Sequence, residues 1–140
     1  MNKEAESYLR TKDRGFLATM GEEGPTVIPV CFAYEAGKIF SAIDRKPKSR
    51  RGLARITNIE RNPRVAFIVD TYADDWRRLS YLLIHGTASL LKDASGEERK
   101  AKELLLLKYP QYRWLGLGGD ARIIGVAIES LKLWKFQSRA

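Results

Sequence analysis

Residues 15–43 read GFLATMGEEGPTVIPVCFAYEAGKIFSAI, which is three strand-like runs separated by two glycine-containing turns. The runs cover residues 15–20, 26–34 and 38–43, and they contain the β-branched and aromatic side chains that favour strands. Glycine suits the positive φ angles that tight connections need. Because the connections are short, this stretch predicts a β meander of antiparallel strands.

Pro29 lies in the middle of the second run. Proline has no backbone N–H, so it is found on edge strands or at bulges. Residues 26–34 are therefore predicted to form an edge or bulged strand whose backbone groups remain available to a ligand. Cys31, in the same run, is interpreted as a small core residue.

The rest of the chain adds three helices and four strands to the meander. The predicted helices begin at Asn2, after Pro47 with Ser49 as N-cap, and at the Ser95–Glu98 capping box. The second helix ends at Asn62–Pro63. The further strands are predicted at 65–69, 79–91, 123–128 and 131–136. Seven strands with peripheral helices indicate one domain, 1–140, of the α+β class, mainly β, built as an antiparallel barrel.

Composition excludes several classes of protein. The chain has 140 residues, one Cys and one His, so neither an intrachain disulfide nor a zinc cluster is expected, and we predict no metal site. Its apolar runs are shorter than the ~20 residues that span a bilayer, and no signal peptide is recognisable. We therefore expect a cytoplasmic protein that does not bind membranes.

Positive charge is concentrated in residues 45–64. This segment holds eight of the 25 Lys and Arg residues against one acidic residue, Glu60, while the whole chain carries +8. Three interpretations are open: a solvated helix face, a nucleic-acid surface, and a phosphate site at the helix entrance. The segment contains no aromatic residue, and its compactness favours the phosphate site, with no nucleic acid as partner.

Two further places contain residue types that often carry chemistry. Residues 70–76, DTYADDW, are too polar to continue a strand, and the indole of Trp76 is expected to be buried or to cap a pocket or an interface. His85 falls inside the predicted strand 79–91 and is interpreted as a structural histidine.

Several segments together resemble the flavin and deazaflavin split-barrel family related to pyridoxamine 5'-phosphate oxidase. The resemblance extends over essentially the whole chain, and residues 70–76 and 86–88 are similar to its subgroup of F420-dependent oxidoreductases. The segments are RGFLAT (14–19), GPTVIPVCF (24–32), IDRKPKS (43–49), LARITNI (53–59), NPRV (62–65), DTYADDW (70–76) and GTA (86–88).

The resemblance implies a split-barrel homodimer with two cofactor sites at the subunit interface. The cofactor ring would lie against residues 27–30 and 41–43, which include Pro29, Val30 and Ser41. The phosphate end would be bound by the entrance of the basic helix. Trp76, of the same chain or of the partner subunit, would shape the pocket. The implied phosphate ligands are Lys46, Lys48 and Ser49, with Arg55 and Asn58 as further candidates.

The implied function is hydride transfer between F420 and a small organic acceptor. FMN is the alternative cofactor, and the concentration of basic residues favours F420, whose tail is an oligoglutamate. A flavin- or haem-binding protein without turnover is the alternative from another class. Tyr72, Tyr81 or a water molecule could supply a proton, and the sequence does not choose among them.

Overall fold

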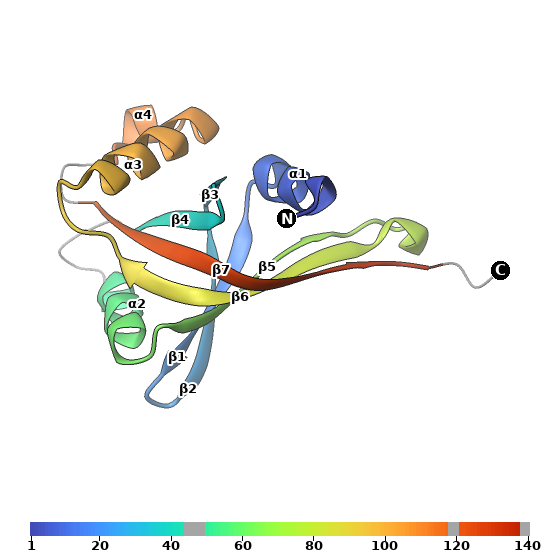
Figure 1. The fold of residues 1–140 in the computed structure, drawn as a ribbon, viewed down its shortest axis with the longest axis horizontal. Helices are drawn as coiled ribbons and strands as arrows, with labels where there is room; N and C mark the ends of the chain where they lie inside the picture. Colours follow the sequence, from blue (N-terminus) through green and yellow to red (C-terminus); the bar gives the residue numbers. More distant parts are fainter. Residues whose placement is uncertain (44–49, 118–120, 138–140) are drawn as a thin grey trace.

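The computed structural model describes residues 1–43, 50–117 and 121–137, with residues 50–53 described by their backbone only (Figure 1). Its elements follow the predicted order of helix, strands, helix, strands and helix, and the chain then closes with one strand where two were predicted. They are α1 (Lys3–Thr11), β1 (Gly15–Gly21), β2 (Gly24–Val30), β3 (Ala33–Glu35), β4 (Lys38–Ile43), α2 (Arg50–Arg61), β5 (Arg64–Thr71), the 3-10 helix η1 (Trp76–Arg78), β6 (Ser80–Leu90), α3 (Gly96–Lys108), α4 (Tyr112–Leu115) and β7 (Arg122–Lys135).

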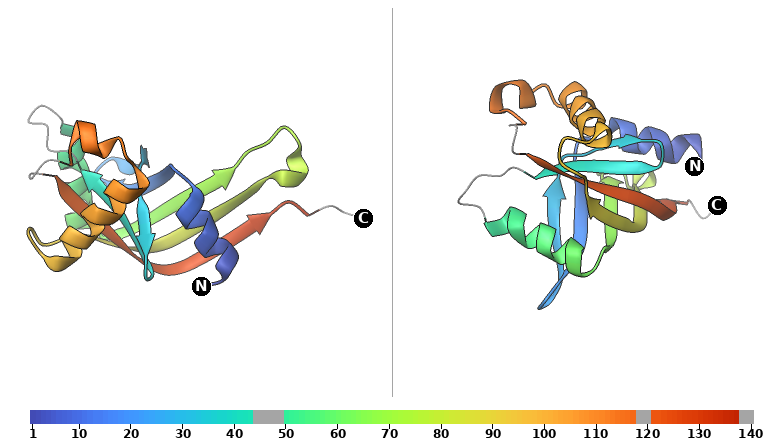
Figure 2. Two further views of the ribbon diagram at one scale, coloured as in Figure 1. Left: turned by 90° about the horizontal axis from the view of Figure 1, so that it is seen from above. Right: turned by 60° about the vertical axis from the view of Figure 1, so that its left-hand side comes forward.

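The strands form one seven-stranded sheet in the order β2-β1-β5-β6-β7-β4-β3, and every paired neighbour is antiparallel. Helices α1 and α3 lie on one side of this sheet, whereas α2 lies beside β1 at the opposite end (Figures 1 and 2). The strong curvature of the sheet encloses the apolar core. The predicted mainly β antiparallel architecture is therefore confirmed.

The predicted strand 26–34 is wrong as one element, because the chain leaves the sheet at Cys31 and Phe32. The Tyr109 hydroxyl takes the place of a neighbouring strand: it accepts from the Phe32 N–H at 2.9 Å and lies 2.9 Å from the Phe32 carbonyl oxygen. The edge position predicted from Pro29 is correct, because β2 is the first strand of the order.

The two predicted strands 123–128 and 131–136 are in fact one strand, β7. Its pairing with β6 shifts between two consecutive residues: His85 lies opposite Ser130, whereas Gly86 lies opposite Ile128. Glu129 is thus the additional residue of a β-bulge, which kinks a strand without ending it. The gap that the sequence predicted between two strands is therefore a bulge within one strand.

The core lies between the sheet and α1, with a second cluster beneath α3. The main cluster includes Leu9, Leu17, Phe67 and Ile84, and the second is built around Leu105 and Ile123. Regular alternation along β5 and β6 buries every second side chain. We use the term outer face for the opposite side of β1, β5, β6 and β7.

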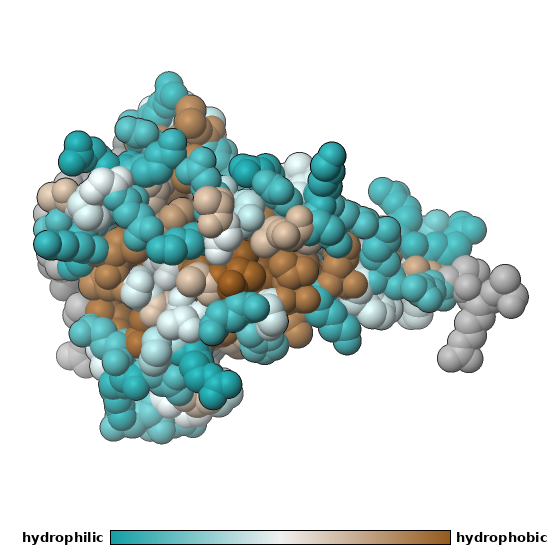
Figure 3. Space-filling model, viewed as in Figure 1, coloured by the Kyte–Doolittle hydropathy of each residue, from teal (hydrophilic) through white to brown (hydrophobic). Residues whose placement is uncertain are grey.

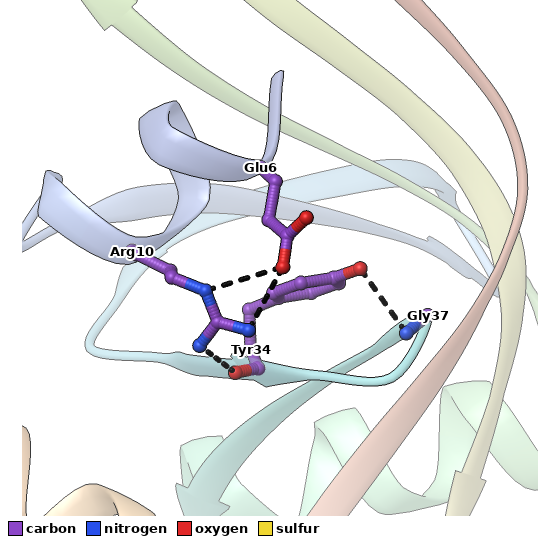
Figure 4. Close-up of polar contacts among 4 residues, drawn as sticks. All are labelled: Glu6, Arg10, Tyr34 and Gly37. Atoms are coloured by element: carbon purple, nitrogen blue, oxygen red, sulfur yellow. Dashed lines mark hydrogen bonds and ion pairs between the residues drawn. The ribbon is translucent and has the colours of Figure 1, made fainter. Parts of the chain in front are cut away.

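Caps and side-chain contacts fasten the helices to this frame. Asn2 caps α1 by accepting from the Ala5 N–H at 2.8 Å, and Ser95 caps α3 by accepting from the Glu98 N–H at 3.2 Å, as predicted. The Arg10 guanidinium pairs with Glu6 and lies over the Tyr34 ring at 5.3 Å (Figure 4). Figure 4 also shows the Tyr34 hydroxyl accepting from the Gly37 N–H of the β3–β4 turn.

Helix α2 ends immediately before Asn62 and Pro63, as predicted. Its start after Pro47 and the N-cap at Ser49 lie outside the described residues. Within the described ranges, no helix has the combination of length and apolar composition that crossing a bilayer requires.

Candidate functional site

A cleft of about 440 Å³ lies between α2 and the β1–β2 hairpin. Both sides of it are built from elements that the sequence predicts, and three of the predicted site residues meet there. Its lining consists of Thr19, Thr26, Ile28, Pro29, Ala54, Arg55 and Asn58. Of these, Pro29, Arg55 and Asn58 were expected from the resemblance.

Helical spacing explains why Arg55 and Asn58 face the cleft together. Residues three apart share one face of a helix, while Ile56 and Ile59 on the neighbouring face pack into the core. The Asn58 side-chain amide donates to the Thr19 hydroxyl at 3.1 Å and so ties α2 to β1. Thr19 is a site residue that the resemblance did not supply. It lies directly opposite Thr26 in the β1–β2 hairpin, so both threonines line the cleft.

Arg55 is the electrostatically unusual residue of the cleft. Its side chain is partly buried, and its Nε has no hydrogen-bond partner although it is shielded from solvent. This burial lowers the pKa of the guanidinium. Within the described part of the chain, no carboxylate forms an ion pair with it. A cation buried without a counter-ion is costly, so the site is prepared for an anion.

Val30 and Ser41, two further predicted ligands, do not line this cleft. Val30 is buried in the core, and its backbone pairs with Gly15. Ser41 is buried on β4 opposite Ile124. Lys46, Lys48 and Ser49 lie outside the described residues, so their role as phosphate ligands stays a prediction.

Trp76 is exposed, contrary to the expectation that its indole is buried: 63% of its surface is accessible. It lies in η1, between β5 and β6, at the end of the sheet distant from α2 (Figure 1). The structure of one chain therefore does not bring Trp76 to the cleft, and its role there stays a prediction for the partner subunit. Tyr72 is also exposed, and Tyr81 stacks on Trp134 with 5.5 Å between ring centroids.

Two single residues of reactive type also differ from expectation. Cys31 is exposed rather than in the core, because the chain has already left the sheet at that point. Desolvation by its neighbours nevertheless raises the pKa of its thiol. His85 is on β6 as predicted, but it points to the outer face and is exposed, so the structural interpretation is wrong.

The outer face contains a second cavity, of about 820 Å³, to which His85 contributes. The signal that could have found it was the alternation of β6, where Leu82, Ile84 and Ala88 are buried and the residues between them face outward. Among the described residues, no group of three His, Cys, Asp or Glu side chains has an arrangement that could hold a metal ion.

Comparison with known proteins agrees with this fold. The model of the pyridoxamine 5'-phosphate oxidase family matches residues 1–135. The chain belongs to this family. The resemblance noted from the sequence is thus confirmed, and so is the family's flavin-binding split-barrel fold.

One relative that is similar in sequence is a reductase. The 5a,11a-dehydrotetracycline/5a,11a-dehydrooxytetracycline reductase of Streptomyces rimosus is 31% identical over 118 residues, which cover 81% of this chain and 82% of the relative.

Solved structures show the same fold at lower identity. The conserved hypothetical protein Rv2991 of Mycobacterium tuberculosis superposes with a TM-score of 0.78 at 19% identity, covering 96% of this chain and 85% of its own. An FAD-binding protein of Mesorhizobium loti superposes with a TM-score of 0.74 at 19% identity, covering 95% of this chain and 94% of its own.

Proposed function

We propose that this protein is an F420-dependent oxidoreductase that transfers a hydride between the deazaflavin and a small unsaturated organic acceptor. The observation that carries the proposal is Arg55, whose partly buried guanidinium has an unpartnered Nε in a cleft of a flavin-binding fold. The cofactor's phosphate is the anion that would complete this site.

The residues of the cleft fit a phosphorylated ring cofactor. Arg55 supplies charge. The Asn58 side-chain amide donates to the Thr19 and Thr26 hydroxyls at 3.1 Å and 3.5 Å, which leaves these hydroxyls their own hydrogens to donate. Lys46, Lys48 and Ser49 would extend this phosphate site along the chain. Pro29 lies on the edge strand β2, whose outer side has no neighbouring strand in the sheet, so backbone groups there remain free to orient a ring.

When bound, F420 or FMN supplies the hydride chemistry. This chain's own contribution is to bind the phosphate end, to orient the ring and to exclude water. The cleft is partly apolar, because Ile28, Pro29 and Ala54 line it, and low polarity strengthens the interaction of Arg55 with an anion.

F420 is proposed over FMN because of charge. F420 carries an oligoglutamate tail as well as a phosphate, and the segment 45–64, with a net charge of +7 from eight basic residues and Glu60, would attract both. The relative from Streptomyces rimosus is named as a reductase, which supports reduction of the acceptor as the direction.

The proposed functional unit is a homodimer that shares its cofactor sites. Apolar residues gather across the middle of the face shown in Figure 3, over β6 and β7, with hydrophilic residues around them. On the outer face, the register aligns Phe16, Ile68 and Leu83 in one row, and each of them is only partly buried. A second copy would cover such a surface.

The test is parallel titration of the purified protein with F420 and FMN, monitored by cofactor fluorescence, with light scattering for the oligomeric state. We expect a dimer that binds F420 more tightly than FMN and oxidises reduced F420 when supplied with unsaturated acceptors. Tighter binding of FMN would transfer the proposal to that cofactor, whereas binding of neither would end it. Binding without turnover of any acceptor would favour a carrier or sensor.

A further inference from the structure

The outer-face cavity has polar groups brought together by the bulge in β7. Its volume is about 820 Å³, and its lining includes Arg64, His85 and Glu129. Bulges re-aim side chains and occur often beside active sites. Gly86 is required at this point, because a Cβ there would collide with the carbonyl oxygen of Ala127.

The register explains why these polar groups converge. Arg64 on β5 lies directly opposite Thr87 on β6, and His85 is two residues from Thr87 on the same face. The diagonal between such positions is within reach of long side chains. The Thr87 hydroxyl donates to Glu129 Oε1 at 2.6 Å, which fixes the carboxylate as an acceptor at this edge.

Arg64 and His85 are exposed, and neither side chain forms a hydrogen bond or ion pair with any residue in the described ranges. Asn62 Oδ1 accepts from the Arg64 backbone N–H at 3.1 Å, so its amide N–H groups remain free to donate. The cavity therefore has donors on one side and the Glu129 carboxylate on another. Ala18, Ala66 and His85 lie in one cross-strand row, and the two alanines leave room for a flat apolar body beside the imidazole.

We propose that this cavity binds the acceptor, and that the acceptor is a planar aromatic acid that also carries a hydroxyl group. Arg64 pairs with the ionised acid, His85 donates to the same end, and Glu129 accepts from the hydroxyl. The assignment as acceptor rests on the proposed function, because the outer face is the surface that a second subunit would bring to a shared cofactor site. The binding itself does not depend on it.

The single histidine of the chain gives a direct probe. In protein labelled with ¹⁵N-histidine, the imidazole signals belong to His85 alone, and titration with 3-hydroxy-2-naphthoate should shift them saturably. The fluorescence of the naphthoate measures its affinity independently. 2-Naphthol, which lacks the acid, should bind at least about tenfold more weakly.

Arg64→Gln should weaken naphthoate binding about tenfold or more, because it removes a charge-assisted hydrogen bond. The matched control is Arg113→Gln on α4, which is also an exposed arginine but lies outside the cavity, and it should leave the affinity unchanged. Unmoved His85 signals at millimolar naphthoate, or equal affinities of wild type and Arg64→Gln, would overturn the proposal.

Cofactor titrations separate this inference from the proposed function. Arg64 belongs to the basic segment 45–64 but does not line the Arg55 cleft, so we expect Arg64→Gln to weaken F420 binding much less than it weakens naphthoate binding. If F420 binds but the naphthoate does not, this inference fails and the proposed function stands. If the naphthoate binds in the Arg64-dependent manner but no cofactor binds, the role as acceptor site is overturned together with the proposed function.

Discussion

Replacement of Arg55 by Met is expected to stabilise the unliganded protein and to weaken cofactor binding. In the folded chain the guanidinium is partly buried, its Nε has no hydrogen-bond partner, and its pKa is lowered by burial. Methionine keeps an unbranched stem of similar reach and removes the charge. The two effects have opposite signs because the same desolvated cation is costly alone and favourable beside an anion.

The magnitudes follow from this environment. An unsatisfied buried polar group costs about 1–3 kcal/mol, and partial exposure places the expected gain near the low end, at about 1 kcal/mol. For a chain of 140 residues this gain raises Tm by about 4 °C. Loss of a charge-assisted hydrogen bond to phosphate costs about 1.5–3 kcal/mol, which is roughly a 10- to 150-fold rise in Kd.

Thermal unfolding of the apoprotein followed by circular dichroism measures the first effect, and fluorescence titration with F420 and FMN measures the second. The matched control is Arg61→Met on the same helix. Arg61 is exposed and pairs with Glu22 at 3.5 Å, so both quantities should change little. A lower Tm together with unchanged cofactor affinity in Arg55→Met would refute the argument.

Three further predictions concern the frame of the site. Gly86→Ala should destabilise the fold by about 2–4 kcal/mol because its Cβ meets backbone, whereas Gly96→Ala, with open space at its Cβ, should change stability by less than about 0.5 kcal/mol in urea unfolding. Tyr109→Phe should cost about 2–3 kcal/mol in the same assay, since it strips the buried Phe32 N–H of its acceptor; a loss below 0.5 kcal/mol would contradict this. Burial lowers the pKa of Lys108 from 10.5 to about 8, so the unfolded chain binds this proton more tightly than the folded chain does. The free energy of unfolding of the wild type should therefore rise by about 1–2 kcal/mol relative to that of Lys108→Met between pH 7.5 and pH 10, a range that allows for partial exposure. A difference that stays constant with pH would show that the amine is not desolvated.

The sequence predicted helix ends correctly where neighbouring residues determine them. The cap at Asn2, the Ser95–Glu98 pair and the end of α2 before Pro63 depend on residues within one or two turns of each other. The edge position of β2 also follows from a single covalent property, the missing N–H of Pro29.

Predictions failed where a distant partner replaced a local one. Phe32 leaves the sheet because of the Tyr109 hydroxyl, 77 positions away in the chain. The apparent gap in β7 is a bulge because its pairing with β6 shifts at His85. The outward position of His85 was readable from alternation, but the cavity around it also needs Arg64 from a third element.

Charge, helix caps, strand periodicity and family resemblance are properties of the covalent chain, and they determined that a cationic helix would follow a β meander in a mainly β fold. They could not determine which of the described basic side chains would be both desolvated and left without a partner. That depends on burial against β1 and β2, which only the folded sheet creates, and it selected Arg55 from the basic segment. Desolvation is a property of the surroundings and not of the side chain, so the sequence pointed to the segment and the packing pointed to the residue.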